Sequence, residues 1–270
     1  MALLRRGSLQ LQRGLGPPAA WWRLRAAMAT AAAPAPEQAS LEDAFGYKIK
    51  PCSLALPPDS MIRYVEPHPG GFRGLMLKVL GFYSKESTRI RGAKRLYARI
   101  TSQVENPELY SSFGLEKKFR TVHAMLLLHV WMVLVRLRNE EKGANIGQTM
   151  YEVFNLDLEQ RIYKEGVKMT MIITKWLKEL EKNFYGASVA YDKALSGSSM
   201  KEDLERALWR NVFAEDDSPM PKSGPQLANV QAFARYVRRE LACLVITESE
   251  DFRTGNIRFS TEFEALKEDH

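Results

Sequence analysis

The sequence predicts an all-α fold, a single bundle of about six or seven helices, and three observations support this. Fifteen residues between Arg120 and Arg136 are apolar apart from Thr121, His123 and His129, and no glycine or proline interrupts them. Several other segments repeat apolar residues at the helical spacing of three and four. No segment alternates convincingly between apolar and polar residues with a period of two, as a half-buried strand would.

The run between Arg120 and Arg136 is predicted to be the central helix of a soluble core, because it is apolar on nearly every face. Its fifteen residues would span about 22 Å as a helix, whereas crossing a bilayer takes about 20 residues. His123 and His129 lie six positions apart, so their rings point about 120° from each other and cannot share one metal ion. Hydrogen-bonded core histidines are the favoured interpretation.

The N-terminal stretch 1–36 is predicted to be a mitochondrial or plastid presequence. It contains five arginines, no lysine and no acidic residue, and leucines and tryptophans lie between the arginines. An arginine-rich, acid-free start is typical of an organellar presequence, while a secretory signal needs an unbroken apolar stretch. A disordered tail is the alternative. The composition further predicts an irregular linker at 37–70, a helical domain at 71–247 and an acidic tail at 248–270.

The net charge depends strongly on the presequence. The formal charge is +7, from 39 basic and 32 acidic residues, and residues 1–36 hold five of the basic residues. The rest of the chain therefore carries 34 basic against 32 acidic residues, so the excess that would suggest nucleic acid lies mostly in the presequence. Within the remainder, residues 61–138 are basic and residues 139–270 acidic. Cys52 and Cys243 lack a zinc-binding or disulfide pattern, which suits a reducing compartment.

The basic half contains one amphipathic helix, predicted over residues 87–104. Its apolar side is formed by Ile90, Ala93, Leu96, Tyr97, Ile100 and Val104. Its other side carries four cations, Arg91, Lys94, Arg95 and Arg99. Two interpretations remain open for these four: an ordinary solvated helix face, or a surface that contacts ribosomal phosphates or acidic lipid. Four clustered cations raise the local potential enough for the second.

The other helices follow in order. Asn106 and Pro107 are predicted to open a short helix as N-cap and first helical residue. Ser199 with Glu202 forms a capping box that starts another helix, which carries Leu204, Ala207, Leu208 and Val212 inward. The cleanest apolar stripe, over residues 169–184, is expected to kink or end at Gly186. Further helices are predicted at residues 148–163 and 227–244, with a loop at 214–225.

No motif for catalysis or cofactor binding is found. The sequence lacks a GxGxxG or GKS/T nucleotide loop, a GxSxG or HExxH motif, and a cysteine near a candidate base. A di-iron bundle would need Glu-x-x-His pairs, and none occurs. The sequence therefore predicts no enzyme, no catalytic residue, no metal, no cofactor and no small-molecule substrate.

Several blocks resemble the ubiquinol–cytochrome c chaperone family, the assembly factors of respiratory complex III. The most specific are LHVWM and LVR at 128–136, and ALWR at 207–210. Weaker blocks are FYG with YD at 184–192, and YVR at 236–238; the resemblance covers about residues 75–241. The positions that it marks are expected in the core or at a partner interface: His129, Trp131, Arg136, Tyr185, Tyr191, Asp192, Trp209, Arg210, Tyr236 and Arg238.

This resemblance implies a helical, non-enzymatic protein in the mitochondrial matrix, peripherally associated with the inner membrane. It also implies a heterodimer with a small complex III assembly factor, association with the mitochondrial ribosome, and newly made cytochrome b as the client. A client made of transmembrane helices needs an apolar groove, and a ribosome presents phosphates to a basic face.

Two other classes remain as alternatives. One is an organellar RNA- or ribosome-binding helical protein without a client, which would use Arg91 to Arg99 as its contact. It would do so without an RRM, KH or OB signature and without an aromatic platform beside the basic face. The other is an enzyme whose site comes together only in the folded chain.

Overall fold

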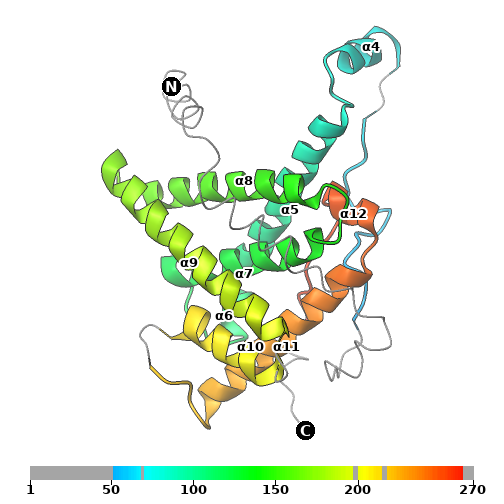
Figure 1. The fold of residues 1–270 in the computed structure, drawn as a ribbon. Coiled ribbons are helices and arrows are strands. Elements are labelled where there is room, and N and C mark those ends of the chain that lie inside the picture. Colours follow the sequence, from blue (N-terminus) through cyan, green and yellow to red (C-terminus); the bar gives the residue numbers. More distant parts are fainter. Residues whose placement is uncertain (1–50, 68–69, 197–199, 215–217, 264–270) are drawn as a thin grey trace.

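The computed structural model describes residues 51–67, 70–196, 200–214 and 218–263 (Figure 1). The predicted presequence, part of the predicted linker (37–50 and 68–69) and the capping serine Ser199 lie outside these residues. Within them the chain forms nine α-helices and no strand, apart from a lone antiparallel bridge between Ala55 and Ile257. The predicted all-α class is therefore confirmed. The two helices beyond the expected six or seven are short ones, which precede and follow the predicted series.

The helices occur in the following order. They are α4 (Gly71–Val79), α5 (Lys85–Glu105), α6 (Glu108–Ser111), α7 (Phe119–Leu137), α8 (Gly143–Lys164), α9 (Thr170–Ser196), α10 (Met200–Leu208), a π-helical turn (Trp209–Phe213), α11 (Pro225–Ile246) and α12 (Ser249–Thr254). The amide of Glu108 donates to the Asn106 side chain, as expected of an N-cap. α9 runs through Gly186 without ending there, so the expected end of the helix is wrong.

α7 forms the centre of the bundle. Sixteen of its nineteen residues are buried, which matches a helix that is apolar on nearly every face. α5, α8, α9 and α11 all pack against it, so the longer helices surround one core. Among the described residues α7 alone is long and apolar enough to cross a membrane, and 83% of that stretch is buried inside the protein. The prediction of a central core helix is confirmed.

The two ends of the described chain lie together and pack on the bundle. Backbone hydrogen bonds join Leu56 to Asn256 at 2.8 Å and Arg258 to Leu54 at 2.9 Å. Four apolar residues after position 248 belong to the core, namely Phe252, Ile257, Phe259 and Phe263. Part of the segment predicted as a linker, and most of the segment predicted as an acidic tail, are thus built into the fold. The packed body extends on both sides beyond the predicted limits of 71 and 247.

A close contact between backbones fixes the C-terminal segment on α5. Gly92 lies on the face of α5 that meets α12, and a Cβ atom there would lie 2.1 Å from the Arg253 carbonyl oxygen. Gly255 follows α12 with φ at +73°, a left-handed conformation that glycine adopts without strain. A Cβ atom at Gly255 would lie 2.5 Å from the Cβ of Arg95. Both positions therefore require glycine for the two segments to touch.

α4 is the one helix that stands away from the body. It projects beyond the N-terminal end of α5 at the upper right of Figure 1, and none of its residues is buried. Gly81, with φ at +73°, lies in the short turn that joins it to α5. The opposite end of the molecule is formed by α10 and the start of α11 (Figure 1).

Candidate functional site

His129 lies in the middle of α7 and links three helices through hydrogen bonds. Its Nδ1 donates to the Met125 carbonyl oxygen at 2.8 Å, which leaves Nε2 to accept from the Tyr236 hydroxyl on α11 at 2.9 Å. That hydroxyl accepts from the Gln103 side chain on α5 at 3.0 Å, and Gln103 also donates to the Ser260 carbonyl. Two of the positions marked by the resemblance, His129 and Tyr236, are therefore partners in the core.

Trp131, Tyr191 and Asp192 form the contact between α7 and α9. The rings of Trp131 and Tyr191 pack with their centroids 4.9 Å apart, and both side chains are buried. The Trp131 indole nitrogen donates to Asp192 at 2.9 Å, and Arg138 donates to both carboxylate oxygens of Asp192 at 2.8 Å. The carboxylate thus pairs with a charged donor and also orients the indole.

Arg136 caps the C-terminal end of α11 by donating hydrogen bonds to its carbonyl groups. Its Nε donates to the Leu244 carbonyl at 2.9 Å, and a second nitrogen reaches the Thr247 carbonyl at 3.3 Å. A third lies 2.5 Å from the carboxylate of Glu140, whose side chain is 3% exposed. A cation at this position satisfies helix carbonyls that have no partner within the helix, and it complements the helix dipole. Ser249, the first residue of α12, donates to the same carboxylate at 2.7 Å.

The remaining motif positions lie mostly in the core. Trp209 opens the π-helical turn, is 7% exposed, and donates from its indole nitrogen to the Ser218 carbonyl at 2.9 Å. Tyr185 is half-buried beside the core, and Arg238 is buried on α11. Arg210 is exposed. Of the ten positions expected in the core or at an interface, Arg210 is the one that the described surface leaves open to a partner.

Two of the four cations predicted as a contact surface on α5 are bound by the segments on either side of it. Arg91 lies 2.5 Å from the carboxylate of Glu66 and donates to the Phe82 carbonyl at 2.7 Å. Arg95 donates from Nε to the Thr254 carbonyl at 2.5 Å. Both guanidinium groups also lie over aromatic rings within cation–π distance.

Arg99 is held in the same way, and only Lys94 is exposed. Arg99 donates to the Gly255 carbonyl at 3.0 Å and to the Ile62 carbonyl at 2.6 Å. The three arginines thus anchor the ends of the described chain instead of lying on one open face of α5 with Lys94. Of the four predicted cations, Lys94 is the one that remains exposed.

The two histidines of α7 make the free energy of unfolding depend on pH. Burial lowers the pKa of His123 and of His129 to about 4, against about 6.5 in an unfolded chain. Between these values the unfolded state binds protons that the folded state excludes. Stability should therefore be fully present above pH 6.5 and fall below it, by about 1.4 kcal/mol per pH unit for each histidine.

Urea midpoints measured from pH 7.5 to pH 5 test this expectation. His123→Leu is the matched variant, because His123 stacks on Phe154 and its Nε2 has no hydrogen-bond partner among the described residues. The expectation that both histidines are hydrogen-bonded thus holds fully only for His129. Removing His123 should halve the slope, and a midpoint that does not change over this range would contradict the expectation.

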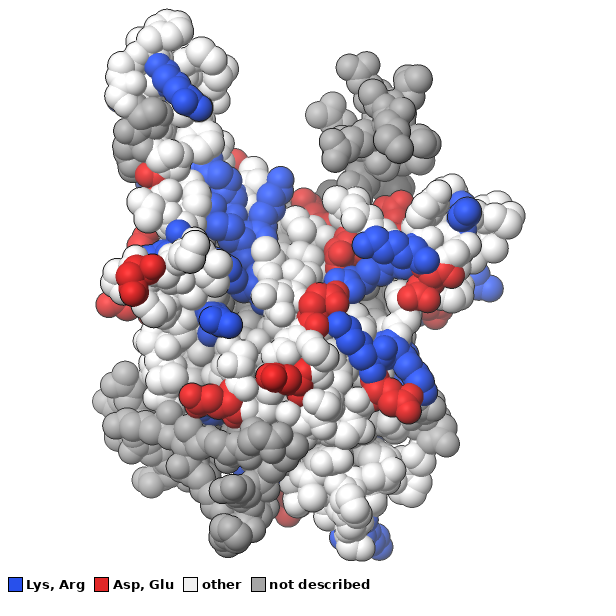
Figure 2. Space-filling view, turned by 180° about the vertical axis from the view of Figure 1, so that it is seen from behind, with Lys and Arg blue, Asp and Glu red and all other residues white. Residues whose placement is uncertain are grey.

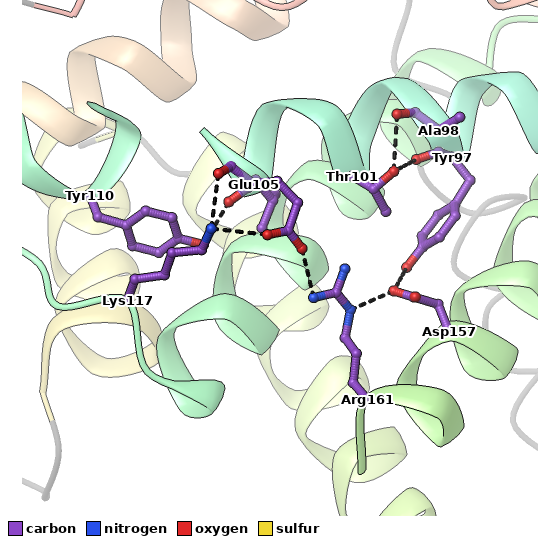
Figure 3. A network of polar contacts seen from close by, with 9 residues as sticks. Tyr97, Ala98, Thr101, Glu105, Tyr110, Lys117, Asp157 and Arg161 are labelled. Carbon is purple, nitrogen blue, oxygen red and sulfur yellow. Dashed lines mark hydrogen bonds and ion pairs between the residues drawn. The ribbon is translucent and has the colours of Figure 1, made fainter. Parts of the chain in front are cut away.

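A second polar network joins α5 to α8 at the surface (Figure 3). Arg161 lies 2.7 Å from Asp157 and 2.8 Å from Glu105, and Asp157 also accepts from the Tyr97 hydroxyl at 2.7 Å. Lys117 donates to Glu105 at 2.9 Å, and this bond together with Arg161 lowers the pKa of the Glu105 carboxyl group. Each carboxylate faces a cation, so the network acts as a clamp between helices rather than as an acid–base pair.

The corner between α8 and α9 exposes large apolar side chains. Tyr163, Met169, Ile172 and Trp176, which we call the apolar corner, are 54%, 64%, 39% and 42% exposed. Sequence spacing placed the last three in the inward stripe of α9. The bundle covers only part of that stripe and leaves these three side chains exposed. Ile173, next to Ile172, is buried, and the helix turns its neighbours outward. Adjacent apolar residues such as Ile172 and Ile173 are the sequence signal for this arrangement, because neighbours on a helix point in different directions and cannot both face the core.

The described residues expose two apolar surfaces that suit association with other molecules. Among the described residues no group of three or more histidine, cysteine, aspartate or glutamate side chains could hold a metal ion. The motif residues stabilise the bundle, while large apolar side chains lie exposed at the apolar corner and on α4. Seen from behind, lysine and arginine side chains gather below the arm formed by α4 (Figure 2).

Comparison with known proteins identifies relatives of this fold. The family model described as ubiquinol-cytochrome C chaperone matches residues 111–259. The mouse (Mus musculus) protein "Ubiquinol-cytochrome c reductase complex assembly factor 1" is 28% identical over 72% of this chain and 64% of its own length. "Protein CBP3, mitochondrial" of Saccharomyces cerevisiae is 26% identical over 56% of this chain and 43% of its own. The matches thus span less than two thirds of these relatives.

A solved structure shares the fold. The "Crystal structure of the Cbp3 homolog from Brucella abortus" superposes with a TM-score of 0.56 at 23% sequence identity. The match covers 68% of this chain and 96% of that one. The family match extends beyond residue 241, where the resemblance in the sequence ended, and reaches Phe259 of the packed C-terminal segment.

Proposed function

The chain belongs to the ubiquinol-cytochrome C chaperone family, and from this premise we propose that it is a non-enzymatic assembly factor for mitochondrial ubiquinol–cytochrome c reductase, complex III. The names of the mouse and yeast relatives support both the assembly role and the mitochondrial location. In this proposal residues 1–36 direct the chain to the matrix, where it associates peripherally with the inner membrane.

The client that we propose is newly made cytochrome b, received near the mitochondrial ribosome together with a small partner assembly factor. The observation that carries this proposal is the apolar corner. Transmembrane segments expose apolar side chains to water before they insert, and a soluble chaperone must cover them with apolar surface of its own. Met169 and Trp176 suit that task, because methionine adapts its shape and tryptophan offers a large contact area.

A capture experiment in mitochondria tests the proposed client surface. The triple variant Met169→Ser, Ile172→Ser and Trp176→Ser should still fold, since more than a third of each residue is exposed to solvent. Radiolabelled mitochondrial translation products are then recovered with tagged protein. Each lost apolar contact removes part of the roughly 1.5–3 kcal/mol that burial of such a side chain contributes. We expect recovery of cytochrome b to fall at least tenfold.

The matched control lies on the same helix. Met171 and Val189 are 83% and 63% exposed on other faces of α9, so Met171→Ser with Val189→Ser lowers surface apolarity without touching the apolar corner. The control should capture cytochrome b like the wild-type protein. Equal recovery with the triple variant would reject the apolar corner as the client surface, and absence of cytochrome b from the wild-type sample would reject the client.

The alternative of an RNA-binding helical protein without a client has less support. Its main contact would be the basic face of α5, and Arg91, Arg95 and Arg99 are engaged within the chain. Phosphate contacts need cations that can approach a nucleic acid. Lys94 alone provides too little positive potential for that role.

A further inference from the structure

α4 has an apolar stripe that faces away from the protein. Phe72, Leu75, Met76, Val79 and Leu80 follow the spacing i, i+3, i+4, i+7 and i+8 of one helix face. These side chains are 81%, 60%, 51%, 78% and 69% exposed. An amphipathic helix of a globular domain normally turns such a stripe toward the core, and here Gly74 and Leu77 are the half-buried residues instead. The stripe is oriented toward something outside the chain.

α4 is also too short to be stable as an isolated helix. It has nine residues, among them Gly71 and Gly74, and isolated helices below about 12 residues are marginal in water. Contacts with the body do not compensate, because no residue of α4 is buried. The helix therefore depends on an outside surface that takes up its apolar face.

The charges around the stripe specify what that surface is. Arg73 and Lys78 lie on α4, Lys85 follows at the start of α5, and the chain has no acidic residue between Glu66 and Glu86. The arm therefore carries three positive charges beside five apolar side chains. This combination is typical of helices that lie in the interface of a bilayer with anionic lipids.

A pocket at the foot of the arm strengthens this assignment. It has a volume of about 300 Å³ and lies between the start of α5, the turn after α7, and α12. Its charged lining comprises four cations and two carboxylates: Lys85, Arg89, Lys142, Arg253, Glu141 and Glu250. Arg89 pairs with Glu86, Arg253 with Glu250 at 3.2 Å, and Lys142 lies 3.9 Å from Glu141. Lys85 is thus the lining cation that gives the pocket its positive excess, and it connects the pocket directly with the arm. A phosphate headgroup can enter here while its acyl chains lie beside α4.

We propose that α4 is a membrane-docking helix, which lies in the interface of an anionic bilayer with Phe72, Leu75 and Val79 toward the acyl chains. Arg73, Lys78 and Lys85 face the lipid phosphates. The arm stands at the end of the molecule opposite α10, so it reaches a flat surface before the bundle does (Figure 1). The inference deepens the proposed function and rests on it for the identity of the membrane, while binding to lipid depends only on α4 and the adjacent Lys85.

The experiment places an environment-sensitive dye on the stripe of the full chain. Met76→Cys in a Cys52→Ser background takes an NBD label, since Cys243 is buried. The presequence is itself basic and can bind lipid, so the readout is local to the label rather than total binding. With vesicles of phosphatidylcholine and cardiolipin, NBD emission should shift to the blue and be quenched by brominated acyl chains. An NBD label at Lys94→Cys, which is exposed on the body of the protein, should show neither the blue shift nor the quenching.

Variants separate the two contributions. Phe72→Ser, Leu75→Ser and Val79→Ser together should abolish the response at position 76, while Met171→Ser with Val189→Ser should leave it intact. Arg73→Gln, Lys78→Gln and Lys85→Gln together should lower the local partition coefficient about 100-fold, since each cation contributes about fivefold near an anionic surface.

Every outcome of this experiment decides between named alternatives. No response at position 76 with anionic vesicles overturns the proposal, as does an equal response with neutral phosphatidylcholine. A response produced by mitochondrial protein extract but not by vesicles overturns it in favour of a protein partner. Because cytochrome b capture is measured separately, failure of membrane docking and failure of the client role can be told apart.

Discussion

Replacing Trp131 with alanine is expected to lower the free energy of unfolding by about 3–5 kcal/mol, through lost burial and the cavity left behind. Trp131 is 1% exposed, packs on Tyr191 and donates to Asp192. Against a total stability of about 5–15 kcal/mol, the loss is large. A thermal melt of the purified variant should show a midpoint lower by about 10 °C. If the proposed function holds, complex III levels should fall with the protein level.

Trp131→Phe provides the control for the hydrogen bond. It keeps an aromatic ring against Tyr191 but removes the indole donor, while Asp192 retains its pair with Arg138. The cost should therefore be smaller, about 1–2 kcal/mol. An alanine variant that melts like the wild-type protein would show that the space around position 131 is filled in some other way than by this side chain.

Arg136→Met is expected to cost about 3–5 kcal/mol, because it leaves a buried carboxylate without its main partner. Glu140 would keep Ser249, and Arg253 at 3.9 Å, so the loss should lie near the lower end. The Leu244 and Thr247 carbonyls at the end of α11 would also lose their donor. Urea denaturation at pH 7.5 measures the change.

The double variant Arg136→Met with Glu140→Leu separates these two causes. Removing both members of a buried ion pair is often nearly neutral, since neither charge is left without a partner. Recovery of most of the stability would assign the loss to the stranded carboxylate. A double variant as unstable as the single one would assign it to the uncapped end of α11.

The sequence was informative wherever burial depends on one helix alone. α7 is apolar on nearly every side, so no choice of face was needed to predict it as the core. α11 likewise carries its predicted apolar residues, Val230, Phe233 and Val237, in the core. Spacing along a helix contains this information because each side chain points in a direction set by its position.

The hydrogen-bond partners of the polar face of a helix could not be predicted in the same way. A helical wheel places Arg95 and Arg99 opposite the apolar stripe of α5, but their acceptors are backbone carbonyls 159 and 156 residues further along the chain. Every residue has a backbone carbonyl, so the pattern of residue types does not show which carbonyl will accept a hydrogen bond. The packing of residues 248–263 on the core could not be predicted either. Their four buried aromatic or aliphatic residues are scattered among charged residues without helical spacing.

The two candidate surfaces illustrate a different limit. The apolar residues of residues 169–184 fit a helical stripe well, yet the pattern does not tell whether the protein itself covers the stripe. In α4 the stripe is short and flanked by glycines, so it gave no clear signal at all. Exposure depends on how far neighbouring helices extend, which only the folded chain determines.

The junction between the two ends of the described chain determines when folding can finish. The Leu54 amide donates to the Thr247 hydroxyl, and the Tyr64 amide to Asn256, across 193 and 192 positions of sequence. Contacts of such separation close the longest loops and form slowly. A chain that emerges or is threaded from its N-terminus must hold residues 52–56, whose hydrogen-bond partners lie at 243–258, unpaired until almost everything else has arrived. Completion of the bundle therefore signals that the chain has been delivered as far as Phe263.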